Sequence, residues 1–317
     1  MIHESVESVR AFAPATAANL AVGFDLLGLA FPPVGDEVTL TKRKDGKIFI
    51  ESIESAEPLP KDIHKNTASI ALHAACEALQ ITAGFSLHIK KGIPLCSGMG
   101  GSAASAVAAL VAFNEFLKSP LSKETLISFA RLGEKETSGD AHLDNVVPCL
   151  YGGLTLIHTQ DPLQVIELPV PSLHCILLHP HLKISTKSAR EVLKKEISLK
   201  DHVKQSAHLG AFIAALYKKD MALLKSALVD CLIEPQRASL IPGFYEAKQN
   251  ALEAGALGMS LSGSGPTLFA FALEEKTAEH IATAMKKPFL QNNIACDTWI
   301  APLAHHRAQV IEIIGRK

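Results

Sequence analysis

A short glycine-rich loop between a strand pattern and an apolar helix pattern limits the folds open to this chain more than any other feature. Residues 85–90 alternate apolar and polar side chains, which predicts a half-buried strand. Residues 102–118 are apolar on nearly every side, which predicts a helix buried over most of its surface. The loop between them holds Gly98, Gly100 and Gly101. We therefore expect this helix to lie inside a layered structure of sheets and helices.

The rest of the chain alternates between short strand and helix patterns. Residues 36–42 and 47–53 flank Asp45-Gly46, which predicts a β-hairpin. A hairpin mixed with helices favours an α+β fold with mixed or antiparallel sheets over a purely parallel sheet. Further helices are expected near 66–80, 122–137, 186–197, 203–218, 221–231, 243–254 and 276–287, and further strands near 154–158, 175–179, 257–273 (two strands around a loop) and 295–301.

A length of 317 residues favours two domains. Three prolines, Pro162, Pro169 and Pro171, fall in a stretch of weak periodicity. Such a stretch is typical of a domain junction. We therefore divide the chain into residues 1–160 and residues 161–317.

Charge and cysteine content exclude several classes of protein. Lys and Arg number 31 and Asp and Glu 32, so the basic excess typical of nucleic-acid-binding proteins is missing. Charged residues break every apolar stretch before it reaches membrane-spanning length, and the opening MIHESVESVR shows no secretory signal. The six cysteines form no CxxC pair, which suits a reducing compartment. We expect a cytoplasmic protein with neither a nucleic-acid nor a membrane partner.

The glycine-rich loop has the properties of a phosphate site. Its glycines permit positive φ, and the helix that follows presents free N–H groups at its positive end. Three interpretations compete: a flexible turn, a Walker loop and a dinucleotide fingerprint. The Walker loop requires a lysine that is absent here. The fingerprint matches Gly98 to Ala103, but it needs a second strand ending in an acidic residue, and helix patterns occupy that region.

Two other segments contain residues suited to a site. A second glycine-rich loop, residues 260–267, would let its backbone approach a substrate closely. The nearly apolar segment 12–31 contains Asn19 and Asp25. A buried carboxylate without partners is costly, so Asp25 is expected to lie in a cleft or to accept hydrogen bonds. For both residues, capping or turn formation is the alternative role.

These segments together resemble the GHMP small-molecule kinases. The family's phosphate loop, Pro-x-x-x-Gly-Leu-Gly-Ser-Ser-Ala, corresponds to Pro94-Leu-Cys-Ser97-Gly98-Met99-Gly100-Gly101-Ser102-Ala103. Within the family, the segment Ala13-Pro-Ala-Thr-Ala-Ala-Asn19-Leu-Ala-Val-Gly23-Phe-Asp25-Leu-Leu-Gly28 is similar to that of the homoserine kinases. So are four more, in the same order: His142-Leu-Asp144-Asn145-Val-Val-Pro148, Thr186-Lys-Ser-Ala-Arg190, Pro235-Gln-Arg237-Ala-Ser-Leu-Ile-Pro242-Gly-Phe and Ser262-Gly263-Ser264-Gly-Pro-Thr267.

The resemblance implies a two-domain GHMP kinase fold with mixed or antiparallel sheets covered by helices. It implies transfer of the γ-phosphoryl group of ATP to the hydroxyl of L-homoserine, a step of threonine biosynthesis, by a homodimer that uses Mg²⁺. Residues 1–160 would carry the phosphate loop, and residues 161–317 would complete the substrate site. The residues implied for ATP are Asn66, near Thr67 and Lys90, and the loop residues Pro94, Ser97, Gly98, Met99, Gly100, Gly101, Ser102 and Ala103.

The metal site departs from the family at one position. The resemblance implies Ser102 and Glu134 as Mg²⁺ ligands, with Glu136 as a near neighbour. Gly101 stands where the family has the first of two serines, so one hydroxyl near the metal is absent. Either water or Ser102 would take its place.

The remaining residues suit a zwitterionic amino acid. Arg190 and Arg237 would bind its carboxylate, because Arg binds carboxylates bidentately. For the ammonium and hydroxyl ends, the resemblance implies Asn19, Asp25 and Asp144, with His142, Thr186 and Gly263 completing the site. Asp144 would either orient the hydroxyl or accept its proton. Two alternatives stay open: a GHMP kinase for another small alcohol, and a non-catalytic sensor, which the loss of serine at Gly101 favours.

Overall fold

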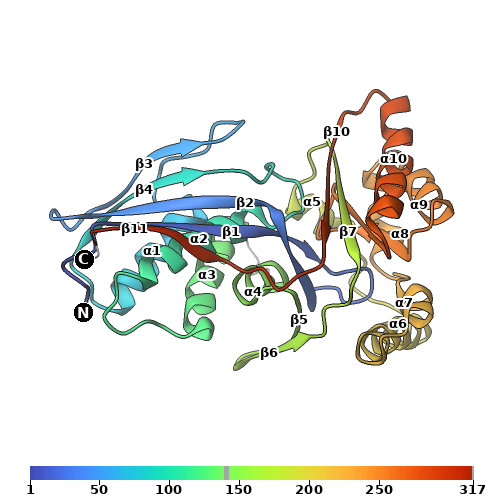
Figure 1. Cartoon of the computed structure of the whole chain (residues 1–317), viewed down its shortest axis with the longest axis horizontal. Coiled ribbons are helices and arrows are strands. Elements are labelled where there is room, and N and C mark those ends of the chain that lie inside the picture. Colours follow the sequence, from blue (N-terminus) through green and yellow to red (C-terminus); the bar gives the residue numbers. More distant parts are fainter. Residues whose placement is uncertain (139–142, 316–317) are drawn as a thin grey trace.

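Two β-sheets organise the computed structural model, which describes residues 1–138 and 143–315 (Figure 1). In this part of the chain, the first sheet has seven strands and the second has four. Helices pack against both sheets, so the fold is α+β with mixed and antiparallel sheets, as predicted. None of the helices described is long and apolar enough to cross a membrane.

The first sheet has the strand order β11-β1-β2-β4-β3, and β5 and β6 extend it from β2. Its neighbouring strands are antiparallel except for β3 and β4, which are parallel. The helix α2 packs against β1 and β2 and touches α1, α3 and α4. The strands are β1 (Ser8–Ala18), β2 (Leu27–Arg43), β3 (Ile48–Glu54), β4 (Gly84–Lys90), β5 (Leu154–Gln160), β6 (Leu163–Leu168) and β11 (Gln309–Ile314), and the helices are α1 (Thr67–Ala78), α2 (Gly101–Asn114), α3 (Lys123–Ser138) and α4 (Leu143–Tyr151).

The second sheet has the order β10-β7-β9-β8 and is antiparallel throughout. The helices α9 and α10 pack on it around a second apolar core. Its elements are β7 (His174–Pro180), β8 (Gly258–Leu261), β9 (Leu268–Ala272), β10 (Cys296–Pro302), α5 (Thr186–Glu191), α6 (Leu199–Lys218), α7 (Met221–Ala227), α8 (Glu234–Arg237), the 3-10 turn η1 (Ala238–Leu240), α9 (Phe244–Glu253) and α10 (Glu275–Gln291).

The chain crosses between the sheets more than once. The strand β6 follows residue 160 and pairs with β5 in the first sheet. After β10, the chain returns to the first sheet, where β11 pairs with β1 and brings Ile314 opposite Ser8. Both termini therefore lie at the same end of the molecule (Figure 1). The last strand described, β11, forms an edge of the first sheet and lies next to β1.

The predicted hairpin between residues 36–42 and 47–53 is wrong. Both segments are strands, but β4 lies between them, antiparallel to β2 and parallel to β3. Close approach at the turn makes this insertion possible. A Cβ atom on Gly84 would lie 2.4 Å from both the nitrogen and the oxygen of Lys47, and Phe85 donates its N–H to that same oxygen. A strand distant in sequence thus displaces the pairing that the local turn favours.

The helix predictions differ from the structure mainly in length. The apolar helix α2 ends at Asn114 rather than near 118, and α5 covers only Thr186–Glu191 of the predicted 186–197. Ten residues of α2 are buried, in agreement with its apolar pattern. The sequence analysis did not predict α4, which has Pro148 inside it.

Candidate functional site

A cleft of about 450 Å³ brings together segments from both sheets. It is lined by the loop at the start of α2, by the turn between β1 and β2, by α5, and by the loop between β8 and β9. The predicted site residues that line it are Asn19, Asp25, Asn66, Pro94, Ser97, Gly98, Gly100, Gly101, Ser102, Glu134, Asp144, Thr186, Arg190, Arg237 and Gly263.

Two predicted residues, Met99 and Ala103, are placed differently. Met99 and Ala103 are 0% and 1% exposed and belong to the apolar core, so their side chains are not part of the cleft lining. Their positions alternate with cleft residues, because one side of the loop and helix must face the core. His142 lies outside the described residues.

The loop before α2, residues 94–101, which we call the glycine loop, has the backbone of an anion-binding turn. Gly98 has φ +77°, and Gly100, the N-cap of α2, has φ +69°. A Cβ atom on Gly98 would lie 2.6 Å from the carbonyl oxygen of Ser262, and one on Gly100 would lie 2.1 Å from Oγ1 of Thr16. Only glycine combines this conformation with this packing. Gly100, Gly101 and Ser102, at the start of α2, line the cleft, so the positive end of this helix is next to it.

Neighbouring segments hold the carbonyl groups of the glycine loop. The Ser262 hydroxyl donates to the Gly98 oxygen at 2.8 Å, the N–H of Thr267 to the Ser97 oxygen at 3.1 Å, and the N–H of Thr16 to the Met99 oxygen at 3.0 Å. Donors thus offset the negative ends of three consecutive peptide groups. The loop becomes better suited to an anion such as a phosphate group.

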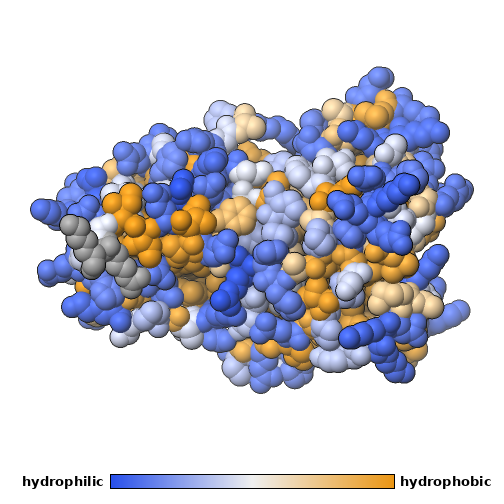
Figure 2. Space-filling model, viewed as in Figure 1, coloured by the Kyte–Doolittle hydropathy of each residue, from blue (hydrophilic) through white to orange (hydrophobic). Residues whose placement is uncertain are grey.

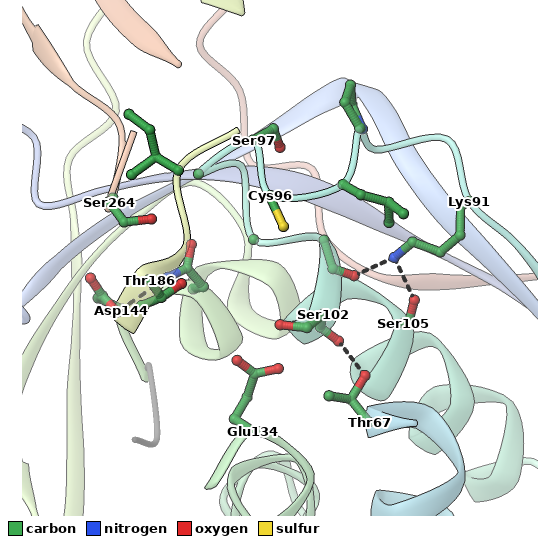
Figure 3. Close-up of a pocket in the computed structure, with 18 of the residues that line it drawn as sticks. Thr67, Lys91, Cys96, Ser97, Ser102, Ser105, Glu134, Asp144, Thr186 and Ser264 are labelled. Carbon is green, nitrogen blue, oxygen red and sulfur yellow. Dashed lines mark hydrogen bonds between the residues drawn. The ribbon is translucent and has the colours of Figure 1, made fainter. Parts of the chain in front are cut away.

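A buried lysine beside the glycine loop was missed by the sequence analysis. Lys91 lines the cleft, whereas Lys90, named near the nucleotide region, points away and pairs with Glu37 at 3.1 Å. The Lys91 ammonium pairs with the buried Asp36. It also donates to the Gly101 oxygen at 2.6 Å and to the Ser105 hydroxyl at 2.8 Å (Figure 3). The β-strand alternation could have shown this, because Lys91 follows the exposed Lys90 and is expected on the opposite face.

An acidic oxygen site lies on the other side of the cleft. Glu134 from α3 is 2% exposed, and Figure 3 shows its carboxylate directed toward Ser102 at the start of α2. The hydroxyl of Thr67 donates to the Ser102 carbonyl oxygen at 3.1 Å and fixes α1 against α2. Among the described residues, no group of three or more His, Cys, Asp or Glu side chains could hold a metal ion. The oxygen donors here suit Mg²⁺, which typically takes one or two carboxylates and completes its shell with phosphate and water.

The turn between β1 and β2, residues 19–25, has an unusual backbone. Asn19, Leu20 and Ala21 are consecutive residues with φ of +71°, +46° and +65°, and Asp25 has φ +57°. Each left-handed residue other than glycine costs about 1–2 kcal/mol. The Asn19 side chain holds this 19–25 turn closed: its oxygen accepts from the N–H of Asp25 at 3.0 Å, and its amide donates to the Gly263 oxygen at 3.0 Å.

Two arginines face this turn from the second half of the chain. Arg190, on α5, pairs with Asp25 at 3.0 Å, and both side chains are about one-third exposed. Arg237, on α8, is 3% exposed and donates to the carbonyl oxygens of Ala189 at 2.9 Å and Gly263 at 3.0 Å. Burial, and then the like charge of Arg190, lower the pKa of Arg237 to about 10, so it stays charged at neutral pH. Together the two form a cationic site for a carboxylate.

Asp144 lines the same cleft as the glycine loop and the two arginines, and its carboxylate favours the charge of Arg237. It is 3% exposed and accepts a hydrogen bond from the Asn145 amide at 3.2 Å. The oxygen of the Asn145 side chain accepts from the Thr16 hydroxyl at 2.7 Å, so α4 is tied to β1. Pro148 has no N–H to offer the Asp144 carbonyl, and Gly28 has no Cβ, which lets β2 approach that oxygen closely. Thr186 lies at the start of α5, where Ser185 is the N-cap.

The sequence analysis did not assign nine further cleft residues to the site. Some lie within the quoted motifs without having been given a role, and the others come mainly from loops, where periodicity carries little information. The nine residues are Leu59, Pro60, Lys65, Leu95, Cys96, Ser105, Asn145, Ile184 and Ser264.

The arrangement suits transfer of a phosphoryl group between two small molecules. One half of the cleft has an anion-binding loop and oxygen donors for a hard cation. The other half has two cations and two carboxylates close together. This set of charges suits a small molecule that carries both a negative and a positive group. Phosphoryl transfer depends mainly on such positioning and charge neutralisation.

Comparison with known proteins identifies two family models in the chain. The model of the GHMP kinases N terminal domain matches residues 66–153, which include the glycine loop, Glu134 and Asp144. The model of the GHMP kinases C terminal matches residues 212–291, which include Arg237 and the loop of Gly263.

Individual relatives match nearly the whole chain. A homoserine kinase of Chlorobium phaeobacteroides is 43% identical over 96% of this chain and 100% of its own length, and one of Xylella fastidiosa is 43% identical over 97% and 95%. The crystal structure of homoserine kinase from Cytophaga hutchinsonii has a TM-score of 0.94 and 42% identity over 98% of this chain and 99% of its own. L. major mevalonate kinase, with a TM-score of 0.74 and 16% identity over 97% of this chain and 100% of its own, shares the fold.

Proposed function

Because this chain belongs to the GHMP kinase family and, within it, to the homoserine kinases, we propose that its cleft binds ATP and L-homoserine and transfers the γ-phosphoryl group of ATP to the homoserine hydroxyl. The products are ADP and O-phospho-L-homoserine, an intermediate of threonine biosynthesis. One observation carries this proposal: the cationic pair Arg190 and Arg237 opens into the same cleft as the glycine loop. We propose that residues 1–160 bind the nucleotide and that residues 161–317 complete the homoserine site.

The glycine loop binds the phosphate groups of ATP. The N–H groups at the start of α2 meet the phosphate oxygens, and the positive end of the helix dipole favours their charge. Asn66, which caps α1 by accepting from the N–H of Ala68 at 3.1 Å, lies at the nucleotide side of the cleft. Lys91 adds a positive charge beside the loop, although Asp36 neutralises much of it.

The two arginines and the 19–25 turn bind homoserine by its charged groups. The guanidinium groups of Arg190 and Arg237 take the carboxylate, and Asp25 takes the ammonium group. Asp25 and Arg190 already form an ion pair without substrate, so each charge of homoserine meets a group of opposite sign. Thr186, Asn19 and Gly263 shape this end of the site.

Asp144 accepts the hydrogen bond of the homoserine hydroxyl. In the transfer, the hydroxyl oxygen forms a bond to the γ-phosphorus as the bond to the ADP oxygen breaks. The hydroxyl proton leaves to Asp144 or to a phosphate oxygen. Phosphoryl transfer relies on alignment more than on covalent chemistry, so the orientation of this hydroxyl controls the rate.

We propose that Ser102 and Glu134 hold Mg²⁺ together with the ATP phosphates. Both side chains offer hard oxygen donors, and Glu134 is a nearly buried carboxylate in the cleft lining. The ion would neutralise charge on the phosphate groups. Gly101 supplies no hydroxyl, and a Cβ atom there would lie 3.2 Å from Ile93, a tighter contact than most. Ser102 therefore acts as the hydroxyl ligand.

We further propose a cytoplasmic homodimer whose partners are small molecules. All six cysteines are free, which suits a reducing compartment. Ile197, Leu199 and Val203 are 49%, 78% and 60% exposed around the start of α6, and such a surface suits a second copy of the chain. Figure 2 shows further hydrophobic patches among polar residues on the face it presents. Sedimentation equilibrium would give the mass of the assembly, and a monomer at all concentrations would contradict the dimer.

The proposed activity is tested by ADP release from Mg-ATP with L-homoserine, L-serine, L-threonine, mevalonate and galactose. Turnover on L-homoserine well above all others is expected. Preferred turnover on another alcohol would point to a different GHMP kinase. Binding of L-homoserine without turnover would indicate a sensor.

A further inference from the structure

The aromatic ring of Phe24 contacts both arginines of the cationic site. The guanidinium carbon of Arg190 lies over the ring at 5.6 Å from its centre, and that of Arg237 at 5.2 Å. Both distances fall within the range of cation–π attraction. Phe24 lies in the 19–25 turn, next to Asp25, and is itself partly exposed. One side chain therefore contacts two cations that belong to different helices.

The ring face attracts two cations whose charges repel each other. Arg190 has the carboxylate of Asp25 at 3.0 Å. The hydrogen bonds of Arg237 go instead to the backbone oxygens of Ala189 and Gly263. Burial and then the like charge of Arg190 lower the pKa of Arg237, and the more weakly acting carboxylates of Asp25, Asp144 and Asp230 raise it. A second carboxylate in place of the ring would form an ion pair with one guanidinium group and draw it away from the other. An aromatic face offers partial negative charge to both without an ionised group that would compete with the substrate.

We propose that Phe24 is a positioning residue that sets the spacing of Arg190 and Arg237 so that the two bind one substrate carboxylate together. The inference rests on the proposed function, because it takes the carboxylate to belong to homoserine. Phe24 contributes through the arginines, so it affects carboxylate binding rather than phosphoryl transfer. A second carboxylate in place of the ring would neutralise the site, whereas the ring leaves its positive charge in place.

The backbone around Phe24 is fixed in a way that fits this role. The left-handed residues Asn19, Leu20 and Ala21 would relax without outside support. Gln205 on α6 supplies part of it: its amide donates to the oxygens of Ala21 at 3.3 Å and Val22 at 3.2 Å. The backbone next to Phe24 is thus held by a residue from the second half of the chain, to which both arginines also belong.

The test compares ring variants at position 24 by their KM for L-homoserine and for ATP. Phe24→Leu keeps an apolar side chain of similar volume but has no π face, and we expect it to raise the KM for L-homoserine about tenfold, with kcat and the KM for ATP within about twofold. Phe24→Tyr and Phe24→Trp keep a π face and are expected to stay close to the wild type. Pentafluorophenylalanine at position 24 keeps the ring shape but reverses its charge distribution, and is expected to behave like Phe24→Leu.

A substrate without the carboxylate separates positioning from general damage. The amino alcohol 3-aminopropan-1-ol is homoserine without that group. Phe24→Leu is expected to leave kcat/KM for it unchanged, because it does not use the arginines. Equal losses on both compounds would mean that the ring only shapes the turn, and this would overturn the proposal. So would a pentafluorophenylalanine enzyme equal to the wild type. Thermal unfolding of each variant shows whether the fold is intact.

Failure of the proposed function would look different. If the wild type does not turn over L-homoserine, the activity assignment is wrong whatever Phe24 does. Calorimetric titration of the wild type and Phe24→Leu with L-homoserine then tests the ring by itself. Weaker binding by the variant supports the positioning role, and equal binding refutes it.

Discussion

The glycine loop and the 19–25 turn both contain left-handed backbone at the cleft, but different types of residue adopt it. In the glycine loop, Gly98 and Gly100 adopt positive φ at no steric cost. Cys96 is the one residue of the glycine loop other than glycine with positive φ, at +54°. In the 19–25 turn, four residues other than glycine adopt it: Leu20 and Ala21 against their preference, and Asn19 and Asp25 at a lower cost. Contacts with distant segments hold both regions: Ser262 and Thr267 donate to carbonyl groups of the glycine loop, and Gln205 donates to those of the 19–25 turn. The two regions therefore differ mainly in residue type: glycines adopt most of the left-handed backbone on the proposed phosphate side, whereas on the proposed homoserine side packing holds other residues in that conformation.

Gly98→Ala should have the largest effect, because it adds a Cβ atom where the glycine loop packs closely against the 262–265 segment. The new methyl group would meet backbone oxygens of Ser262 and Gly265 at 2.6 and 2.7 Å, at a φ that alanine disfavours. We expect kcat/KM to fall on the order of 10³-fold, in the range seen for loss of a preorganised donor. Gly101→Ala is the matched control, since its φ is helical and its nearest contact is 3.2 Å, and it should lose less than tenfold. Similar losses in both variants would contradict a role for positive φ.

Asp144→Asn tests the cleft residue proposed to accept the hydrogen bond of the homoserine hydroxyl. Asparagine keeps the size of the side chain and can still accept from Asn145, but it cannot take up a proton. We expect kcat to fall about 10²-fold, within the range for a lost general base, with both KM values nearly unchanged. An unchanged kcat would remove Asp144 from the mechanism. Thermal unfolding at the wild-type temperature would show that the loss is chemical.

Arg237→Ala should damage the homoserine side alone. Loss of this buried cation removes one of two carboxylate ligands and the support it gives to Gly263. We expect the KM for L-homoserine to rise about 10²-fold, typical of a charged hydrogen bond of about 2–3 kcal/mol, with far less change in the KM for ATP. Arg190→Ala should act in the same direction but more weakly, because Arg190 is more exposed. Equal changes for both substrates would count against carboxylate binding.

Asn19→Ala should release the strained turn. The variant loses the hydrogen bonds to Asp25 and Gly263 that keep the turn closed. We expect the free energy of unfolding to fall by about 1–2 kcal/mol and the KM for L-homoserine to rise about tenfold. Urea unfolding and two-substrate kinetics measure both. An unchanged KM for L-homoserine would mean that the 19–25 turn keeps its conformation without these two hydrogen bonds.

Lys219→Gly should have the smallest effect and sharpens the comparison. Lys219 caps α6 with φ +56° and lies outside the cleft. Glycine removes the steric cost of that conformation, so we expect a gain of about 0.5–1 kcal/mol in the free energy of unfolding with unchanged kinetics. The result would show that the left-handed backbone at Lys219 is not required for activity. A loss of stability would mean that the side chain of Lys219 matters more than its backbone.

The same contrast explains how much could be predicted from the sequence. The strand, glycine loop and helix over residues 84–114 follow from local patterns, and most loop residues predicted to meet ATP line the cleft. The hairpin prediction failed because β4, which is distant in sequence, inserts between β2 and β3. The return of β11 to the first sheet and the support of the 19–25 turn by Gln205 are likewise contacts between distant residues.

Side-chain placement shows the same limit. Arg190, Arg237 and Asp25 were assigned to the site by resemblance to a family, but their arrangement around Phe24 has no pattern in the sequence. Lys91 was missed in favour of Lys90, although strand alternation separates the two. Met99 and Ala103 lie within the phosphate motif, yet the core takes their side chains. A motif identifies a segment, and packing decides which of its residues face the ligand.

The most direct measurement of the central claim is ³¹P NMR of a reaction with L-homoserine and Mg-ATP. If Arg190 and Arg237 hold the carboxylate, the hydroxyl faces the glycine loop and receives the phosphoryl group. The account predicts a stable phosphomonoester signal that grows as the γ-phosphorus signal of ATP disappears. An acyl phosphate would show that the substrate binds in the opposite orientation, and inorganic phosphate alone would show that no transfer to homoserine takes place.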